Sequence, residues 1–325
     1  MRIDFSQLCS RWAALLPRRR QATHWAVASL RPGQMSAVVV TVAAAGARPQ
    51  VLHAATLDHD DTLPMADALS AFARDLQAGG QGWALLLPRD DYRLSVIPEP
   101  EVPAAELAQS VRWQLAATID FAVEDAAVDF IMIPTREHAP QRTPELYAVA
   151  ARGDRVNAFA ALFRHARLDL RAIDIRETAQ RNIAARLERD DELLVMVAFC
   201  DDEVQISFSW RHELYMDRLI AEPACHDDDA ERRATACERI RMQLQRSLDA
   251  VRADFPFMQA ARIVLAGAPD GFLAQLQAGL FDPVEALLPD TLFDLTRVPQ
   301  LQDARHFMRH FHALGVALRD TEAAR

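Results

Sequence analysis

The chain has 325 residues, half of them hydrophobic, with 36 basic and 46 acidic residues and a net charge of −10. This length suffices for a buried core in two domains, or in one domain with an insertion. The acidic excess disfavours sequence-independent binding of nucleic acid, because phosphates attract cations. It favours a basic peptide, or the basic flank of a membrane protein, as partner.

The sequence contains no lysine, so arginine supplies every basic side chain apart from histidine. Arginine stays protonated, which excludes a Walker A lysine, a Schiff-base lysine and a lysine general base. The irregular spacing of Cys9, Cys200, Cys225 and Cys237 indicates neither a zinc site nor a disulfide framework. Apolar runs such as AVVVTVAAAG are shorter than the roughly 20 residues of a membrane span, and the N-terminus lacks a secretory signal. We therefore expect a cytoplasmic protein.

Hydrophobic periodicity predicts the same order of elements twice. The first set comprises the strands HWAVASL, SAVVVTVA and PQVLHAATL, a helix over 63–78 and the strand WALLLP. The second comprises the strands LLVMVAF, VQISFSW and ELYMDRLI, a helix over 228–253, the strand ARIVLAG and a helix over 270–279. Two similar α/β lobes with a cleft between them follow from this repeat.

A segment between the lobes, over 89–169, does not fit the repeat. It contains the strand YRLSVIP, a helix over 103–119, the strands VDFIMIP and ELYAVAA, and a helix over 153–167. The proline-rich stretch PTREHAPQRTP reads as the loop between the last two strands. We predict a small inserted α+β domain.

Two helices of the chain carry aromatic residues that could contact a partner. In the helix over 103–119, the stripe of Leu107, Val111, Leu115 and Ile119 faces a core, and Trp113 points the other way. Trp113 could anchor a partner, with Phe121 beside it, or pack on a neighbouring lobe. The N-terminal stretch FSQLCSRWAALLPRRR has an apolar face followed by three arginines, which suits a membrane-surface helix or a helix docked on the protein itself.

Other titratable clusters have structural explanations. His306 and His310 are one helical turn apart, with His312 nearby, but a metal site would need further ligands, and a partly buried helix face explains them. The acidic runs DHDD (58–61) and HDDD (226–229) suit a solvated turn and a helix N-terminus, where aspartate caps and favours the dipole. No G-x-S-x-G, H-E-x-x-H or complete G-x-G-x-x-G motif occurs, so an independent enzyme activity is not indicated.

A family resemblance rests on five stretches in one order: LLPRDDYRLSVIPEPEVPAAELAQSVRWQLAATIDFAVEDAAVDFIMIP, ELYAVAARGDRV, LDLRAIDIRETAQRNIAA, ERIRMQLQRSLDAVRADFP before ARIVLAG, and HALGVALR. Together they resemble the type IV pilus assembly family PilM, and the first two are most similar to its MSHA-pilus counterpart, MshI. The resemblance implies a bilobal actin-like (ribonuclease H-like) fold with an inserted SHS2-type domain. The first lobe would comprise 1–88 with 170–190 and the C-terminal helix 303–325, the insert 89–169, and the second lobe 191–302.

The resemblance also implies a function. PilM-like proteins bind the N-terminal tail of a bitopic inner-membrane protein, PilN or its equivalent, and connect it to the pilus machinery. We therefore expect a cytoplasmic scaffold of pilus biogenesis, peripheral at the inner membrane, with Trp113 and Phe121 as candidate partner-binding residues. The alternatives are an active ATPase that drives pilus assembly or polymerisation, and the cytoplasmic component of a type II secretion L-type protein.

The first phosphate-binding hairpin of the family departs from its pattern here. Actin-like sites hold phosphates between two hairpins, where glycines let backbone N–H groups approach the anion. The matching stretch VASLRPGQMS has Ala28 or Ser29 where the resemblance implies an aspartate. Arg31, Gly33 and Ser36 are its remaining candidates for phosphate contact.

The other two nucleotide motifs are also altered. The second hairpin places Ala198 and Cys200 at the family's aspartate and glycine positions, and the following Asp201 and Asp202 would repel a triphosphate unless Mg²⁺ lay between them. Where the family has a pair of glycines near the adenosine, Gly267 is followed by an alanine. We predict a degenerate nucleotide site, a pseudo-ATPase, for which ATP with Mg²⁺ would be the cofactor.

Overall fold

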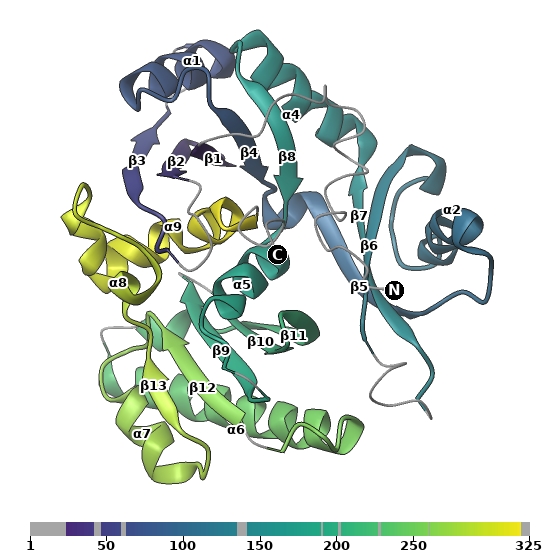
Figure 1. Cartoon of the computed structure of the whole chain (residues 1–325), viewed down its shortest axis with the longest axis vertical. Coiled ribbons are helices and arrows are strands. Elements are labelled where there is room, and N and C mark those ends of the chain that lie inside the picture. Colours follow the sequence, from purple (N-terminus) through teal and green to yellow (C-terminus); the bar gives the residue numbers. More distant parts are fainter. Residues whose placement is uncertain are drawn as a thin grey trace.

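A computed structural model describes eight stretches of the chain: residues 24–41, 47–59, 63–134, 142–189, 191–200, 203–226, 229–259 and 261–319. Its strands form three sheets, two of five strands and one of three (Figure 1). The predicted N-terminal helix with its arginines, most of the proline-rich loop and the turn residues Asp201 and Asp202 lie outside the described residues.

The first five-stranded sheet has the order β3-β2-β1-β4-β8. Its strands are β1 (His24–Arg31), β2 (Gln34–Thr41), β3 (Val51–Asp58), β4 (Gly82–Leu86) and β8 (Asp169–Asp174). Because successive side chains of a strand point to opposite faces, Trp25 and Val27 join one core cluster while Ala26 and Ala28 join another. Both faces are therefore covered, which explains the nearly continuous apolar run of β1.

The second five-stranded sheet has the order β11-β10-β9-β12-β13. Its strands are β9 (Leu193–Cys200), β10 (Glu203–Trp210), β11 (Glu213–Ala221), β12 (Ala261–Ala266) and β13 (Val284–Ala286). In both sheets the first three strands form an antiparallel meander, and the fourth lies parallel beside the first. The predicted repeat of two similar lobes is confirmed by this shared order.

Helices cover the outer faces of the two sheets. They include α1 (Met65–Asp75) on the first lobe, and α6 (Ala230–Asp254) and α7 (Phe272–Gly279) on the second. Asp229 begins α6 by accepting hydrogen bonds from the N–H groups of Glu231 and Arg232, so the acidic run over 226–229 ends in a helix cap, as predicted. The short helical segments are η3 (Arg89–Asp91), η4 (Val123–Asp125), η5 (Pro223–His226), η6 (Pro299–Gln302) and α8 (Pro289–Leu292).

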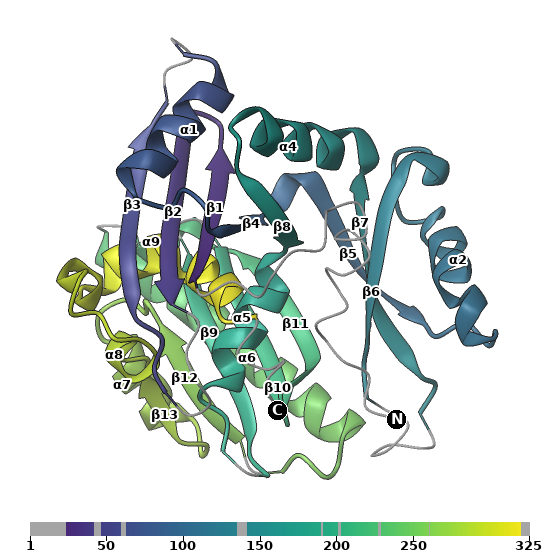
Figure 2. The same ribbon diagram turned by 45° about the horizontal axis from the view of Figure 1, so that its top comes forward.

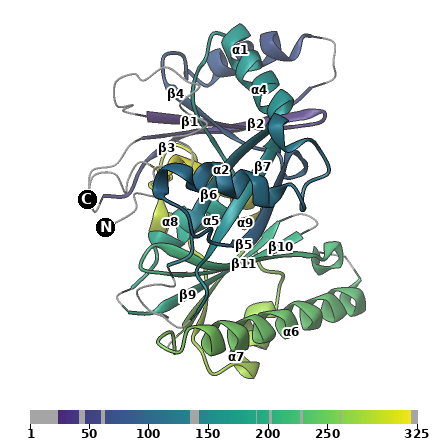
Figure 3. The ribbon, with the colours of Figure 1, turned by 90° about the vertical axis from the view of Figure 1, so that its right-hand side faces the viewer.

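The third sheet, β5-β7-β6, lies within the predicted insert. It comprises β5 (Tyr92–Pro98), β6 (Ala126–Met132) and β7 (Glu145–Arg152). Along β7, Leu146 and Ala148 face α2 (Ala104–Leu115), whereas Tyr147 and Val149 join the cores of the two lobes. The sheet is thus sandwiched between α2 and the lobes (Figures 1 and 3). The domain boundaries themselves remain a prediction.

The apolar stripe predicted for α2 is confirmed, because Val111 and Leu115 are buried and Leu107 and Ile119 pack against them. The helix ends at Leu115 rather than at residue 119. A hydrogen bond from the Thr118 hydroxyl to the Leu115 carbonyl accompanies this end.

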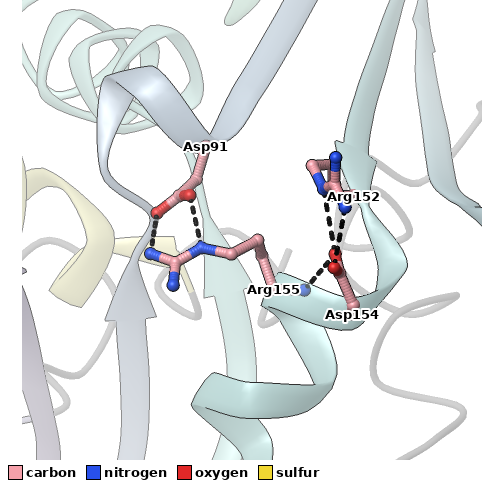
Figure 4. A network of polar contacts seen from close by, with 4 residues as sticks. All are labelled: Asp91, Arg152, Asp154 and Arg155. Carbon is pink, nitrogen blue, oxygen red and sulfur yellow. Dashed lines mark hydrogen bonds and ion pairs between the residues drawn. The ribbon is translucent and has the colours of Figure 1, made fainter. Parts of the chain in front are cut away.

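Ion pairs join the start of the insert to the beginning of α4 (Figure 4). Arg155, near the start of α4 (Gly153–His165), donates to both carboxylate oxygens of Asp91 at 2.8 and 3.1 Å. Beside this pair, Arg152 binds Asp154 through two further hydrogen bonds. A Cβ at Gly153 would lie 2.5 Å from the Asp125 carbonyl oxygen, so only glycine fits this junction.

Two helices, α5 (Arg176–Ala185) and α9 (Ala304–Ala317), lie between the two five-stranded sheets (Figure 2). Residues from both sheets and from these helices form one core cluster, which includes Val27, Met196 and Phe311. The helices cross closely, since a Cβ at Gly315 would lie 2.2 Å from the Ala179 carbonyl oxygen. The two lobes therefore share their innermost core.

We expect Gly315→Ala to destabilise the protein, because the added methyl group must push α9 away from α5. Overpacking of this kind costs about 1–3 kcal/mol, and urea unfolding would measure it. The matched control is Gly279→Ala at the end of α7, where the nearest atom to an added Cβ is 4.0 Å away. Equal stability of the Gly315→Ala variant and the wild type would contradict this close crossing.

Candidate functional site

The first predicted nucleotide-binding cluster lies on the turn between β1 and β2. Arg31 and Gly33 are exposed, and Ser36 is half-buried on β2. Gly33 has φ +72°, which a side chain would disfavour, and its carbonyl accepts a hydrogen bond from the N–H of His59 at 2.8 Å. The structure thus brings these three residues together on one hairpin. The resemblance implies an aspartate at Ala28 or Ser29; Ala28 is buried and only 1% exposed, whereas Ser29 is half-buried.

The second hairpin, between β9 and β10, is engaged by α5. Glu203, the first residue of β10, accepts a 2.6 Å hydrogen bond from Arg176 in the first turn of α5. Cys200 lies close enough to act electrostatically on Arg176. One cation near this hairpin is therefore paired within the protein.

The third predicted position, Gly267, follows β12 and is closely packed. It has φ +68°, and a Cβ there would lie 2.5 Å from the side chain of Met308 on α9 and 3.2 Å from the carbonyl oxygen of Phe199. The next residue, Ala268, packs against the core of the second lobe. The loop that corresponds to the adenosine motif therefore contacts protein side chains closely.

Buried polar groups connect α5, β10 and α9. Gln180 donates to the Met196 carbonyl at 3.1 Å and to the Ser207 hydroxyl at 2.9 Å. The Gln205 amide donates to Asp217 at 2.8 Å, so its oxygen is left to accept the 2.9 Å hydrogen bond from Nε2–H of His312. These bonds satisfy the buried amide donors, whereas the Oε1 atom of Gln180 is buried without a hydrogen-bond partner.

His312 is held neutral in this network. Burial first, and then the positive charges of Arg176 and Arg31, hold the pKa of His312 well below its ordinary value. The electrostatic effect of both arginines also places the first hairpin and the start of α5 near the same segment of α9. A neutral imidazole is consistent with the single hydrogen bond that Nε2 donates to Gln205.

Two acidic residues connect this network to the insert, Glu177 through its carboxyl group and Asp217 through its backbone N–H. The hydroxyl of Tyr92 on β5 donates to Glu177 at 2.7 Å, and the N–H of Asp217 donates to the hydroxyl oxygen of Tyr147 at 2.9 Å. Burial raises the pKa of Glu177. Desolvation, followed by the nearby Glu177, raises the pKa of Asp217. The insert, α5 and the second lobe are therefore held together by hydrogen bonds around groups whose charged forms are disfavoured.

Sequence reasoning missed Glu177, Gln180, Gln205 and Asp217. The signal available in the sequence was that the segment of α5 has no apolar stripe. In the structure every residue from 177 to 184 is buried. Of the histidines weighed as metal ligands, His306 pairs with Asp303 at 2.9 Å on the surface, whereas His310 and His312 are buried. Within the described stretches no three His, Cys, Asp or Glu side chains gather closely enough to hold a metal ion.

The predicted partner-binding residues differ in exposure. Trp113 is 53% exposed on the side of α2 away from the sheet, so it does not pack on a lobe. Phe121 is half-buried against the core between α2 and the sheet. Across the described residues, no helix combines the length and hydropathy needed to cross a membrane.

Comparison with solved structures identifies the fold. The chain shares 17% identity and a TM-score of 0.68 with a structure described as a PilM–PilN type IV pilus biogenesis complex, covering 93% of this chain and 99% of that one. A Bacteroides thetaiotaomicron protein with an actin-like ATPase fold is similar at 10% identity and a TM-score of 0.49, covering 95% of this chain and 99% of that one. The cytoplasmic domain of EpsL from the Vibrio cholerae type II secretion system is similar at 12% identity and a TM-score of 0.46, covering 83% of this chain and 87% of that one. The fold is the bilobal actin-like ATPase fold that the sequence predicts.

A family model described as type IV pilus assembly protein PilM matches residues 51–208. The match covers just under half of the chain, and it confirms the resemblance to this family found in the sequence. No curated protein sequence matches this chain.

We expect stability to fall as the pH decreases from about 6.5, because the buried His310 must stay neutral in the folded state. Burial, with Arg309 and His306 nearby, lowers the pKa of His310 to about 4. An unfolded histidine binds its proton near pH 6.5, so this residue alone removes up to about 3 kcal/mol between the two values. Urea unfolding at about pH 7.5 and pH 5 would show a smaller loss for His310→Gln than for the wild type.

The control for this experiment is His165→Gln, which changes an exposed histidine on α4. Glu177 and Asp217 act in the opposite direction: their raised pKa values mean that the folded state keeps protons the unfolded chain releases, so their contribution is lost as the pH rises. Glu177 and Asp217 therefore cannot cause the loss of stability at low pH that is expected from His310. An unchanged pH dependence in His310→Gln would refute this origin.

Proposed function

We propose that this chain is the PilM-like scaffold of a type IV pilus of the MSHA kind, as in MshI. It acts in the cytoplasm, peripheral at the inner membrane, by binding the N-terminal tail of a PilN-like bitopic protein. The observation that carries this proposal is the fold match with the PilM–PilN complex over 93% of the chain, together with the family match over 51–208. The strand–helix–strand–strand order of the insert supports its assignment as an SHS2-type domain.

The outer edge of β5 is the best candidate for binding this tail. β5 pairs with β7 on one side, and the sheet's described strands end with it on the other. Leu94 of β5 contacts the cores of both lobes, and Val96 is 49% exposed. An extended tail could add a strand to such an edge, with the main chain giving affinity and these apolar side chains giving specificity. The net charge of −10 would attract the tail's basic flank.

We expect the synthetic N-terminal tail of the PilN-like partner to bind the purified protein in calorimetry at low salt. Val96→Glu should weaken binding about tenfold or more, because a charge at the edge must be desolvated next to the tail. The matched control is Val102→Glu, the same substitution at a valine that is 37% exposed before α2. A tail that does not bind the wild type would disprove the scaffold proposal, whereas equal effects of both variants would disprove only the β5 edge.

We further propose that the nucleotide site is degenerate, so that the protein works without ATP turnover. Phosphoryl transfer depends almost entirely on positioning and charge stabilisation. Three observations support the proposal: the position of the expected aspartate is taken by the buried Ala28 or by Ser29, Arg176 is paired with Glu203, and Met308 packs against Gly267. Asp201 and Asp202 would add negative charge beside a triphosphate.

We expect millimolar ATP with Mg²⁺ to leave the melting temperature unchanged. A ligand at 100 times its Kd would add about 2.7 kcal/mol to the free energy of unfolding, which differential scanning fluorimetry detects easily. Mg²⁺ alone and AMP with Mg²⁺ serve as controls for effects of the ion and the base. A clear rise with ATP would instead support the active ATPase, with Arg31, Gly33, Ser36 and Gly267 as its phosphate and adenosine contacts.

A further inference from the structure

The insert meets the second lobe at the edge of a sheet, where one tyrosine binds the backbone. β11 is the end strand of the second five-stranded sheet. The N–H of Asp217 on β11 donates to the hydroxyl oxygen of Tyr147 at 2.9 Å, and this hydroxyl donates to the carbonyl of Tyr215 at 3.5 Å. Ile131 and Ile133 of the insert add apolar contacts with the same lobe. The hydroxyl of Tyr147 thus takes the place that another strand would occupy at this edge.

The insert is attached more firmly to the first lobe than to the second. The chain enters the insert from β4 and leaves it through α4 to β8, and both strands belong to the first sheet. Val149 and Ala151 of the insert also lie in the core of the first lobe. Towards the second lobe, the Tyr147 contact is supplemented by an ion pair between Arg142 and Asp254 at 2.6 Å, which is partly exposed and therefore contributes little. An insert that loosens should therefore separate from the second lobe first.

Two acidic side chains meet at this contact. Glu177 of α5 is 4% exposed, and Asp217 is half-buried on β11. The two carboxyl groups lie close enough for Glu177 to act electrostatically on Asp217. Each is bound by an uncharged donor, Glu177 by the hydroxyl of Tyr92 at 2.7 Å and Asp217 by the amide of Gln205 at 2.8 Å. Because like charges repel and burial disfavours ions, the closed contact disfavours ionisation of both acids at once.

The arginines nearby do not offset the cost of burying these acids. Arg89, at the start of the insert, favours the charged form of both acids, and Arg176 favours that of Glu177. Burial has the larger effect, since it raises the pKa of Glu177 and, with the charge of Glu177, that of Asp217. The charged and titratable groups that act on the pair, or on the side chains bound to it, are Arg89 of η3, Tyr92 of β5, Glu145 and Tyr147 of β7, Arg176 of α5 and, through Gln205 of β10, His312 of α9.

The other titratable side chains of this contact keep their charge near neutral pH. Burial raises the pKa of Tyr92 and of Tyr147, so both hydroxyls stay protonated. Burial lowers the pKa of His312, so its imidazole stays neutral. A change of charge at this contact as the pH rises is therefore expected from Glu177 and Asp217.

We propose that Glu177 and Asp217 form a proton-dependent joint between the insert and the second lobe. The joint is closed, as the structure shows it, while the pair holds a proton, and it loosens when both carboxylates are charged and take up water. Because the closed contact retains protons that an open contact releases, a rise in pH favours opening. Loosening would separate Tyr147 from β11 and leave the insert attached to the first lobe.

The test is hydrogen–deuterium exchange of the full-length protein without any partner, at about pH 6 and about pH 8.5, corrected for the pH dependence of chemical exchange. Residues 213–221 report on the joint, because the N–H of Asp217 is bound by Tyr147. We expect their protection in the wild type to fall as the pH rises, by at most about tenfold per pH unit for each proton released. Residues 34–41, in the interior of the first sheet, are the reference and should keep their protection.

The double variant Glu177→Gln with Asp217→Asn keeps the shapes of both side chains and removes both charges. Its protection over 213–221 should be the same at the two pH values, because the joint has no proton left to release. The matched control is Glu124→Gln with Asp270→Asn, which changes an exposed glutamate of the insert and an exposed aspartate of the second lobe. This control should keep the pH dependence of the wild type.

Three outcomes would overturn the proposal. They are a wild type whose protection over 213–221 does not fall, an equal fall over 34–41, which indicates global opening, and a double variant that keeps the fall. Circular dichroism checks that each variant is folded. If the double variant is not, Glu177→Gln alone decides, since it should make the fall smaller. No partner or nucleotide enters the measurement, so its outcome is independent of the scaffold proposal.

Discussion

The contact between the backbones of α5 and α9 determines how the two halves of this protein meet. At Gly315 the helices are so close that a single added carbon would collide with the carbonyl of Ala179. Apolar side chains from both five-stranded sheets then pack around this helix pair in one cluster. Because a close-packed core tolerates little displacement, the crossing of α5 and α9 sets the separation of the two lobes. The positions of the hairpins at the edges of the lobes depend on this separation.

The same helix pair carries the polar groups that distinguish this interior from an ordinary apolar core. Gln180 and His312 reach from α5 and α9 to β10, and the tyrosines of the insert reach back to Glu177 and to the backbone of Asp217. Such a network is stabilising only when its members are satisfied, and it then favours one arrangement of the parts it connects. Such a fixed arrangement suits the scaffold role proposed above.

The inserted domain carries the surface proposed above for binding the partner's tail. One side of its sheet is buried against both lobes, α2 covers the other, and Arg155 joins the start of the insert to α4. This rigid attachment holds the outer edge of β5 and the exposed Trp113 of α2 in fixed positions relative to the lobes. Binding elements placed on a rigid scaffold lose less freedom on association than mobile ones.

The sequence by itself determined the strands, the repeat of two lobes and the presence of an insert. These features depend on alternation and capping between residues a few positions apart, as in β1 and at Asp229. The family resemblance added the actin-like fold. It also indicated departures from a nucleotide site at Ala28 or Ser29 and at Ala268, but it could not show that Met308 packs against Gly267. Only the tertiary structure decided that, along with the exposure of Trp113 and the pairing of Gln205 with His312, 107 residues apart. Those contacts depend on how two sheets and two helices pack together, and no local pattern in the sequence predicts that packing.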